Sequence, residues 1–425
     1  MHSMPAAAYP EWNWARTYRF GADRVIRPTS IDELAAVVRE HSHAEATLRC
    51  VGSRHSFTGI ADAQSLLDVS TLPERFEIAA DRRSVLVTGS MAYARLAELL
   101  APAELAVANT ASLPHLTIAG ATATGTHGSG DRNGNLATSI RSIEIVTSTG
   151  EVRIVRRGEP DFDVAAISLG ALGAVVAIEL DVEPAFEIEQ QVHTGLGVSD
   201  VADSFDLIFG SAYSVSVFTD WLDRFDLWTK RRTDEPAPHH AELHDGQLAR
   251  VAVHPVFGQD ATGCTPQGST GSWSTRLPHF RANAVPSVGA EVQSEFFVDR
   301  THARQAILAM HSIGNQLAPA MMTSEIRTVR RDELWLSAQY QRDCCAFHFT
   351  WYHDVPAALE ASRLVSRTLG RFSPVPHWGK VFDPAQFVLH ELFPRLPEAL
   401  EVIRDWDPTG TFTNQWVQET IHKQN

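Results

Sequence analysis

Apolar residues recur at helical spacing in three stretches of this chain. In residues 29–42 they recur every three or four positions, and Ser30 with Glu33 forms a capping box at the start of the stretch. Residues 91–100 and 300–317 show the same spacing. The pattern therefore predicts a helix in each of the three.

Other stretches alternate between apolar and polar residues, which is the spacing of a β-strand. Residues 139–155 alternate on both sides of Ser148-Thr149-Gly150, which predicts a hairpin. Further strands are predicted at residues 46–50, 174–184, 290–299, 323–329 and 345–352. Because strands and helices mix without a strict β-α-β rhythm, the predicted fold class is α+β.

Length and composition favour two domains. A chain of 425 residues is long for a single core, and its composition changes after the predicted strand that ends at Pro184. We therefore expect a domain boundary near residue 185. Residues 255–290 are rich in glycine, serine, threonine and proline, and they are predicted to form a long surface loop.

Charge and cysteine content narrow the class of protein. The chain has 36 Lys and Arg against 51 Asp and Glu, a net charge of −15, which disfavours nucleic acids and anionic membranes as partners. No apolar run approaches the roughly 18 residues of a membrane span, and residues 1–20 show no export signal. The four cysteines form no C-x-x-C pair, and no His/Cys spacing resembles a zinc site. We expect a cytoplasmic protein without disulfides or a metal.

Three clusters of small residues fall within the first 180 positions, each beside a predicted strand. They are "VGSRHSFTG" (51–59), "IAGATATGTHGSG" (118–130) and "SLGALG" (168–173). Glycine lets the backbone approach a ligand closely and leaves N–H groups that can hold phosphate oxygens. The motifs G-x-G-x-x-G and G-x-S-x-G are absent, and Thr126 stands where a P-loop needs lysine. One such cluster indicates little, but three are harder to attribute to turns alone.

These clusters also carry a family resemblance. "GSRHSF", "ASLPHLTIAGATATGTHGSG" and "SLGALGAVVAIELDVEPAF" resemble the flavin-binding half of the vanillyl-alcohol oxidase superfamily. With "SEIRTV", "HFTW", "HWGKVF" and "DPTGTFTN", the chain is most similar to bacterial alditol (xylitol) oxidases, and least so between about 190 and 290. The resemblance implies a two-domain fold: an FAD-binding domain of residues 1–185 joined by 385–425, and a substrate-binding cap domain of residues 186–384 with an antiparallel sheet over the flavin.

The resemblance implies that FAD is bound covalently through His55. Without it, His55 is most simply a turn residue with an ordinary hydrogen bond. Some relatives add a second bond from a cysteine, but residues 109–120 contain none, so a single bond is expected. The cofactor contacts implied besides His55 are Gly52, Ser53, Arg54, Ser56, Phe57, Ser112, Thr117, Gly120, Thr124, Gly125, His127, Gly128, Gly173, Val175 and Val176, of which His127 could equally be a turn residue.

Two polar pairs are spaced i, i+2 in predicted strands. Glu325 with Arg327, and His348 with Thr350, each share one face of a strand, so the apolar residues between them face the other way. The same alternation is typical of any half-exposed sheet. The resemblance places both pairs over the flavin, together with Lys380 of "HWGK".

Alcohol oxidation would give these residue types distinct roles. A hydroxyl proton needs an acceptor at neutral pH, and the developing oxyanion needs positive charge, which Arg327 and Lys380 would supply. Glu325 or His348 would accept the proton, and an ordinary pKa near 6.5 favours His348 without excluding Glu325. The substrate-binding residues implied are Ser112, Glu325, Arg327, Thr350 and Lys380.

The implied reaction is oxidation of the terminal primary hydroxyl of an alditol, such as xylitol or sorbitol, to the aldose, with O2 reduced to H2O2. The alternative is a sugar-1,4-lactone oxidase or dehydrogenase of the same superfamily. A non-enzymatic relative would be expected to lack His55 or part of the Glu325, Arg327 and Lys380 set, and this chain has all four. The expected partners are a small polyol and O2, while the preferred polyol, the electron acceptor and the oligomeric state stay open.

Overall fold

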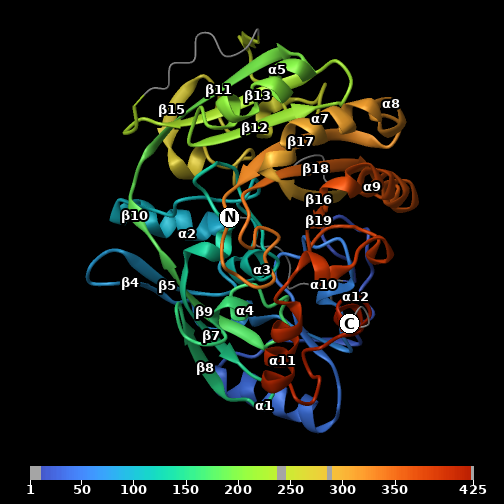
Figure 1. Ribbon diagram of the computed structural model, residues 1–425. Helices are drawn as coiled ribbons and strands as arrows, with labels where there is room; N and C mark the ends of the chain where they lie inside the picture. Colours follow the sequence, from blue (N-terminus) through green and yellow to red (C-terminus); the bar gives the residue numbers. More distant parts are fainter. Residues whose placement is uncertain (1–10, 237–245, 285–289, 423–425) are drawn as a thin grey trace.

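The computed structural model describes residues 11–236, 246–284 and 290–422. They form two domains, one on a large antiparallel sheet and the other on smaller sheets that lie below it in Figure 1. The predicted α+β class is confirmed. No described helix is both long and apolar enough to span a membrane. The expectation that the chain has no export signal rests partly on residues 1–10, which lie outside the described residues.

The first domain is built on a five-stranded antiparallel sheet of order β4-β5-β9-β7-β8. Its strands are β4 (Phe76–Ile78), β5 (Ser84–Thr88), β7 (Ile140–Val146), β8 (Val152–Arg156) and β9 (Ala174–Asp181). The predicted hairpin is the β7–β8 pair. A smaller parallel sheet of order β1-β3-β2 consists of β1 (Arg24–Ile26), β2 (Leu48–Cys50) and β3 (Ser65–Leu67).

Helix α1 (Ile31–His43) confirms the first predicted helix. Ser30 accepts a hydrogen bond from the backbone N–H of Glu33, while the Glu33 carboxylate accepts from Thr29 rather than from Ser30. Leu34 is buried on the face of the helix that packs against the sheets. The other helices of this region are α2 (Tyr93–Leu100), α3 (Ile118–Ala123) and α4 (Phe162–Ala165).

A short strand pair precedes the cap domain. Strand β10 (Glu183–Pro184) pairs with β6 (Leu105–Ala106) in the first domain, and β11 (Glu187–Leu196) then enters the large sheet. This sheet has the order β14-β11-β13-β12-β17-β18-β16-β19, and β15 also pairs with β11. The remaining strands are β12 (Ser214–Thr219), β13 (Phe225–Arg232), β14 (Gln247–Leu248), β15 (Ser269–Ser272), β16 (Glu291–Asp299), β17 (Met321–Val329), β18 (Cys344–Tyr352) and β19 (Val375–Pro376).

Helices cover one face of the cap sheet and leave the other to the pocket. Ile326 of β17 and Phe349 of β18 are fully buried in one core cluster with Met310 and Leu317 of the helical layer. The face that carries Glu325 and His348 is therefore the opposite one. The helices of this domain are α5 (Val198–Asp203), α6 (Phe205–Phe209), α7 (Ala303–Ser312), α8 (Gly314–Leu317) and α9 (Val355–Leu369).

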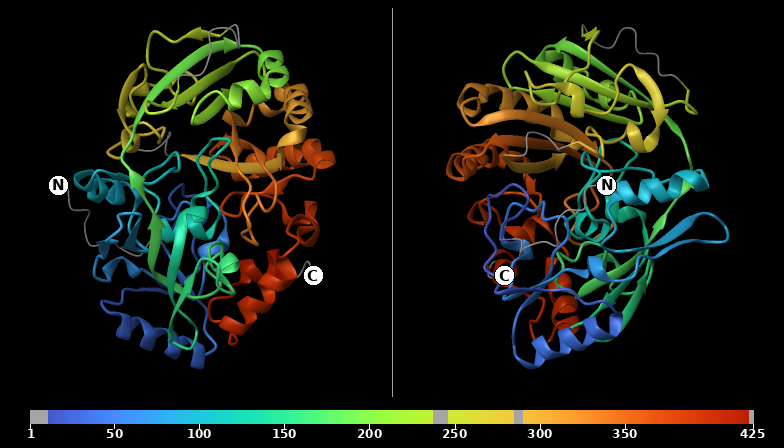
Figure 2. Two further views of the ribbon diagram at one scale, coloured as in Figure 1. Left: turned by 60° about the vertical axis from the view of Figure 1, so that its left-hand side comes forward. Right: turned by 180° about the vertical axis from the view of Figure 1, so that it is seen from behind.

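The chain returns to the first domain at its C-terminal end. Helices α10 (Leu389–Leu392), α11 (Leu396–Trp406) and α12 (Gln415–Thr420), in red, lie beside the smaller sheets in Figures 1 and 2. Buried Arg49 joins three distant segments, because its guanidinium donates to the carbonyl oxygens of Ile60, Leu169 and Phe412. The exact boundaries, 1–185 with 385–425 and 186–384, stay a prediction.

The segment predicted to be a surface loop differs from that expectation. Strand β15 pairs with β11, and Gln190 of β11 donates to the carbonyl oxygens of Thr265 and Pro266. The side chains of Cys264, Leu277 and Phe280 are buried. A composition rich in glycine and serine therefore does not distinguish a surface loop from a segment that is held by long-range pairing. Residues 285–289 of the predicted loop lie outside the described residues.

Candidate active site

A cavity of about 260 Å³ lies where the glycine clusters of the first domain meet the polar face of the cap sheet. We call the side formed by the three glycine clusters, with the nearby Ser112, Thr117 and Val175, the pocket floor. The pocket roof is the set Gln293, Glu295, Glu325, Arg327, His348 and Lys380 on the other side. Both domains therefore line one cavity.

Most of the predicted site residues line this cavity. From the floor they are Gly52, Ser53, Arg54, His55, Ser56, Phe57, Ser112, Thr117, Gly120, Thr124, His127, Gly173 and Val175. From the cap side they are Glu325, Arg327, His348, Thr350 and Lys380. The sequence clusters and the polar strand pairs are therefore brought together.

Three of the predicted cofactor residues do not line the cavity. Gly125 has a φ of +69° and closes the turn after α3. Gly128 packs against Asn109 and Thr110, where a Cβ atom would come within 2.4 Å of the Asn109 amide. Val176 follows Val175 in strand β9, so its side chain points to the opposite face and joins the α1 cluster.

The turn at residues 52–57 is held mainly through its backbone. The N–H of Phe57 donates to the Gly379 carbonyl (2.9 Å), and the N–H of Trp14 donates to the Arg54 carbonyl (2.8 Å). Arg54 has a φ of +60°, which is the left-handed region. At Gly52 the backbone passes so close to Thr117 that a Cβ atom would lie 2.3 Å from the Thr117 hydroxyl. Glycine is therefore required where the two clusters meet.

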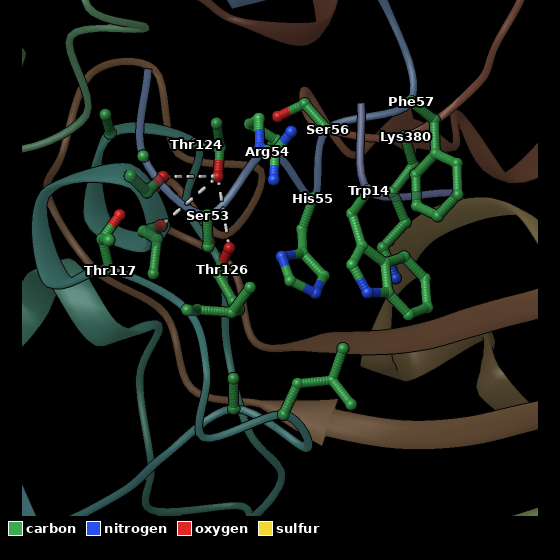
Figure 3. Close-up of a pocket in the computed structure, with 18 of the residues that line it drawn as sticks. Trp14, Ser53, Arg54, His55, Ser56, Phe57, Thr117, Thr124, Thr126 and Lys380 are labelled. Atoms are coloured by element: carbon green, nitrogen blue, oxygen red, sulfur yellow. Dashed lines mark hydrogen bonds between the residues drawn. The ribbon is translucent and has the colours of Figure 1, made fainter. Parts of the chain in front are cut away.

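His55 projects from this turn into the cavity (Figure 3). Its ring stacks on Trp14, with 4.8 Å between ring centroids and 16° between planes. Both ring nitrogens are buried, and neither makes a hydrogen bond of ordinary geometry with the described residues. Burial lowers the pKa of His55 to about 4. The imidazole is therefore neutral and has an unused nitrogen on the cavity side of the turn.

The roof is organised by strand register. Glu325 of β17 is opposite His348 of β18, and His348 is opposite Glu295 of β16. The three side chains therefore form one row across neighbouring strands. Two strand spacings place the ends of this row about 9–10 Å apart. Arg327 spans this distance, because its guanidinium contacts both Glu295 (2.6 Å) and Glu325 (3.6 Å).

Glu295 is the central counter-ion of the roof. Its carboxylate contacts Arg327, Lys380 at 3.0 Å and His127 at 3.1 Å, and its side chain is buried. Burial alone would raise the pKa of Glu295, but the charges of Lys380 and Arg327 outweigh burial and hold it well below the ordinary range. The carboxylate is therefore ionised and holds two cations beside the cavity.

His348 is held as a neutral imidazole. The Gln293 amide nitrogen donates to Glu291, so the Gln293 oxygen accepts a hydrogen bond from His348 Nε2 at 3.1 Å. The lone pair of the imidazole is then on Nδ1. Burial, with the charge of Lys380, lowers the pKa of His348 well below its ordinary value. His348 therefore presents an unprotonated Nδ1 at neutral pH.

Sequence reasoning missed Glu295, Gln293 and His279. Glu295 and Gln293 are two apart in the strand predicted at 290–299, so alternation placed them on one face, but no partner was visible in the sequence. His279 lies in the segment predicted to be a surface loop. Its Nε2 contacts Glu325 Oε1 at 3.1 Å. Only the tertiary structure identifies this contact.

FAD was predicted to bind here, and the floor fits that group. The ring nitrogens of His55, which have no hydrogen-bond partner among the described residues, lie at the cavity. Gly52 has no side chain where it passes Thr117, so the turn presents its backbone to the cavity there. Strand ends and glycine turns with exposed N–H groups suit a pyrophosphate. The residues that would hold the cofactor are therefore those of the floor, with the roof facing them.

Comparison with known proteins agrees with this fit. A family model described as an FAD binding domain matches residues 22–156, and one described as D-arabinono-1,4-lactone oxidase matches residues 290–420. The chain is 42% identical to the alditol oxidase of Streptomyces sp. (strain IKD472), over 96% of this chain and 98% of that protein. It is 27% identical to the L-gulono-1,4-lactone dehydrogenase of Mycobacterium tuberculosis, over 97% and 99%.

Among solved structures, the cholesterol oxidase of B. sterolicum matches with a TM-score of 0.80 and 13% identity, over 96% of both chains. At this identity the likeness concerns the fold alone. It confirms the predicted two-domain flavoprotein architecture. The long match to alditol oxidase and the FAD-binding model lead to one conclusion: the chain belongs to the alditol oxidase family and is an FAD-dependent oxidoreductase.

Proposed function

We propose that this protein oxidises the terminal primary hydroxyl of alditols, such as xylitol and sorbitol, to the aldose, and that O2 is reduced to H2O2. The observation that carries the proposal is the buried roof, in which Glu295 holds Arg327 and Lys380 at the cavity beside neutral His348. The 42% identity to an alditol oxidase over nearly the whole chain supports the same substrate class.

In the reaction, R–CH2OH loses two electrons and two protons and becomes R–CHO. O2 takes up two electrons and two protons and becomes H2O2. FAD, when bound, is the carrier of the electrons between the two half-reactions. The protein residues bind the alcohol, take its hydroxyl proton and stabilise the oxygen from which that proton leaves.

We assign the proton transfer to His348. Its free lone pair on Nδ1 and its neutral state at pH 7 suit a general base, whereas Glu325 is a poorer acceptor. Burial would raise the pKa of Glu325, but Arg327 and His279 outweigh burial and hold it below the ordinary range. Arg327 and Lys380 place positive charge where the alcohol oxygen becomes negative.

Ser112, Glu325 and Thr350 would bind the remaining hydroxyls of the polyol. All three line the cavity, and Glu325 is ionised, so it accepts hydrogen bonds from hydroxyl groups. A substrate that lacks those hydroxyls would leave buried polar groups unpaired, which is costly. This contrast favours polyols over simple alcohols.

We further propose that His55 is the covalent attachment point of FAD, and that the other floor residues that line the cavity contact the cofactor. The support is that neither ring nitrogen of His55 makes a hydrogen bond of ordinary geometry with the described residues. The absence of cysteine from residues 109–120 supports a single bond. Acid-precipitated protein should stay yellow. Quantitative release of flavin into the supernatant would disprove the covalent bond, though not the binding of FAD.

The experiment that tests the activity is a visible spectrum without air, before and after addition of xylitol. Bleaching of the flavin absorbance, followed by H2O2 release on admission of air, is the expected result. An unbleached spectrum with xylitol and sorbitol would contradict the proposal. Bleaching without H2O2 under air would identify a dehydrogenase instead of an oxidase.

A lactone-oxidising activity is the second candidate. The match of residues 290–420 to the D-arabinono-1,4-lactone oxidase model favours it, because that range contains all six roof residues. An aldonolactone assayed beside xylitol separates the two. The four cysteines are free thiols, which supports a reducing compartment and the cytoplasm as the proposed location.

A further inference from the structure

The segment around His279 connects the cap domain to the first domain beside the cavity. The backbone N–H of His279 donates to the Ser112 carbonyl (3.2 Å), and His115 Nε2 donates to the Ala282 carbonyl (2.8 Å). At its other end the segment is paired with β11 through β15. The backbone that carries His279 is therefore held from both domains.

The His279 ring is also fixed. It is 4% exposed and meets Phe218 and Trp228 edge-to-face, with centroid distances of 5.2 Å and 5.3 Å. Each aromatic contact restricts the tilt of the ring. The imidazole therefore has one orientation, with Nε2 toward Glu325 and Nδ1 toward Lys230.

Lys230 and Glu325 together determine which ring nitrogen of His279 carries the proton. Its side chain is buried, and Nζ donates to the Leu277 carbonyl and to His279 Nδ1 (3.3 Å). Nδ1 is then an acceptor, so Nε2 carries the hydrogen and donates it to Glu325 Oε1 at 3.1 Å. Burial, together with the charge of Lys230, lowers the pKa of His279 to about 4, so the ring is neutral.

We propose that His279 and Lys230 are positioning residues that fix the Glu325 carboxylate and thereby set the affinity for a polyol substrate. Lys230 donates a hydrogen bond to His279, and His279 donates one to Glu325 Oε1; we call these two hydrogen bonds the relay. Glu325 Oε2 then faces Arg327. The part of the inference that concerns affinity rests on the function proposed above. The part that concerns the tautomer of His279 does not.

The first test uses steady-state kinetics of the holoenzyme with xylitol. His279→Phe keeps an aromatic ring and removes the N–H, and Lys230→Met removes the donor that orients the ring. Because a hydrogen bond to an ionised carboxylate is lost, KM should rise about tenfold or more, with kcat within about threefold of wild type. His279→Gln restores an N–H near the same position and should recover part of the loss. Thr270→Ala, on the exposed β15 of the same segment, is the matched control.

A KM for xylitol within about twofold of wild type in His279→Phe and Lys230→Met would overturn the role in affinity. Parallel loss of flavin content and turnover in both variants, without rescue in His279→Gln, would mean that the residues only support folding, and would overturn it as well. Failure of the wild type to reduce its flavin with xylitol would instead contradict the proposed function.

The second test does not depend on turnover. The 15N NMR signals of labelled histidine report the tautomer, and His279→Phe identifies the signal of His279. The Nε2–H tautomer is expected in the wild type, with a change toward a mixture in Lys230→Met. An Nδ1–H tautomer in the wild type, or identical spectra in the two proteins, would overturn the relay.

Discussion

The floor and the roof line the same cavity but are stabilised by different interactions. In the floor, backbone hydrogen bonds hold the turn at residues 52–57, and glycines make room for close neighbours, as Gly52 does for Thr117 and Gly128 for Asn109. In the roof, three ionised groups hold one another: Glu295, Arg327 and Lys380. The floor thus depends on shape, whereas the roof depends on charge.

This difference predicts how strongly substitutions on each side of the cavity reduce stability or activity. Removing one member of a buried charge network leaves the others without a partner, which costs more than the net gain of the intact pair. Adding a methyl group to a close backbone contact costs only what the neighbours need to move. We expect substitutions in the roof to have the larger effects, and the following four experiments test that order.

Glu295→Gln should have the largest effect on stability. It removes the carboxylate between Arg327 and Lys380, which leaves Lys380 without its buried carboxylate and Arg327 with Glu325 alone, at a cost of about 3–5 kcal/mol. Urea unfolding of the holoprotein measures it. The control is Glu183→Gln, which breaks a more exposed pair with Arg232 and should cost about 1 kcal/mol or less. Equal losses in the two variants would contradict the central role of Glu295.

Lys380→Met should have the largest effect on turnover while the flavin stays bound. Loss of a charge that stabilises a developing oxyanion lowers kcat by about 10²–10³. Stopped-flow flavin reduction measures it, and Arg371→Met, an exposed cation after α9, is the control. Near-normal reduction by the Lys380 variant would remove this residue from the mechanism.

Gly52→Ala should have a smaller effect. The new Cβ would lie 2.3 Å from the Thr117 hydroxyl, and the required shift should cost about 1–3 kcal/mol and reduce flavin content. Adding Thr117→Ala removes that hydroxyl and leaves Thr117 Cβ at 3.4 Å, so stability should recover. Gly370→Ala, where nothing lies within 4 Å, is the control. A double variant as unstable as Gly52→Ala would show that the contact is not the cause.

The pH dependence of kcat/KM should show the smallest change. Because burial and the charge of Lys380 hold the pKa of His348 well below its ordinary value, the ring stays neutral at the pH where an ordinary histidine would protonate. The acid limb of the profile should therefore be absent near pH 6.5. A limb there that disappears in His348→Gln would mean that His348 titrates normally and that the roof does not shift its pKa.

Much of the fold follows from local sequence. Alternation placed Glu325 and Arg327 on one face of a strand and Ile326 on the other, and the structure has this arrangement. The capping residue and the apolar spacing of α1 could also be predicted from the sequence, because both depend on residues within one or two helical turns. Local periodicity is enough where an element has one buried face.

The candidate site was only partly predictable. Membership of a sequence cluster did not place Val176 at the cavity, since neighbouring strand residues point to opposite faces. His279 and Glu295 could not be assigned, because their partners lie 46 and 32 positions away in the chain. Contacts of this kind depend on the register of the cap sheet, which no single segment of the sequence encodes.

The three acceptors of Arg49 have a consequence for the order in which the first domain is completed during synthesis. Its guanidinium has all three acceptors only when the carbonyl of Phe412, 363 positions further along the chain, is available. Until residue 412 has been synthesised and packed, the buried Arg49 cation lacks one of its three acceptors. Arg49 also lines the cavity, so this side of the cavity is expected to be complete only after residue 412 has joined the first domain.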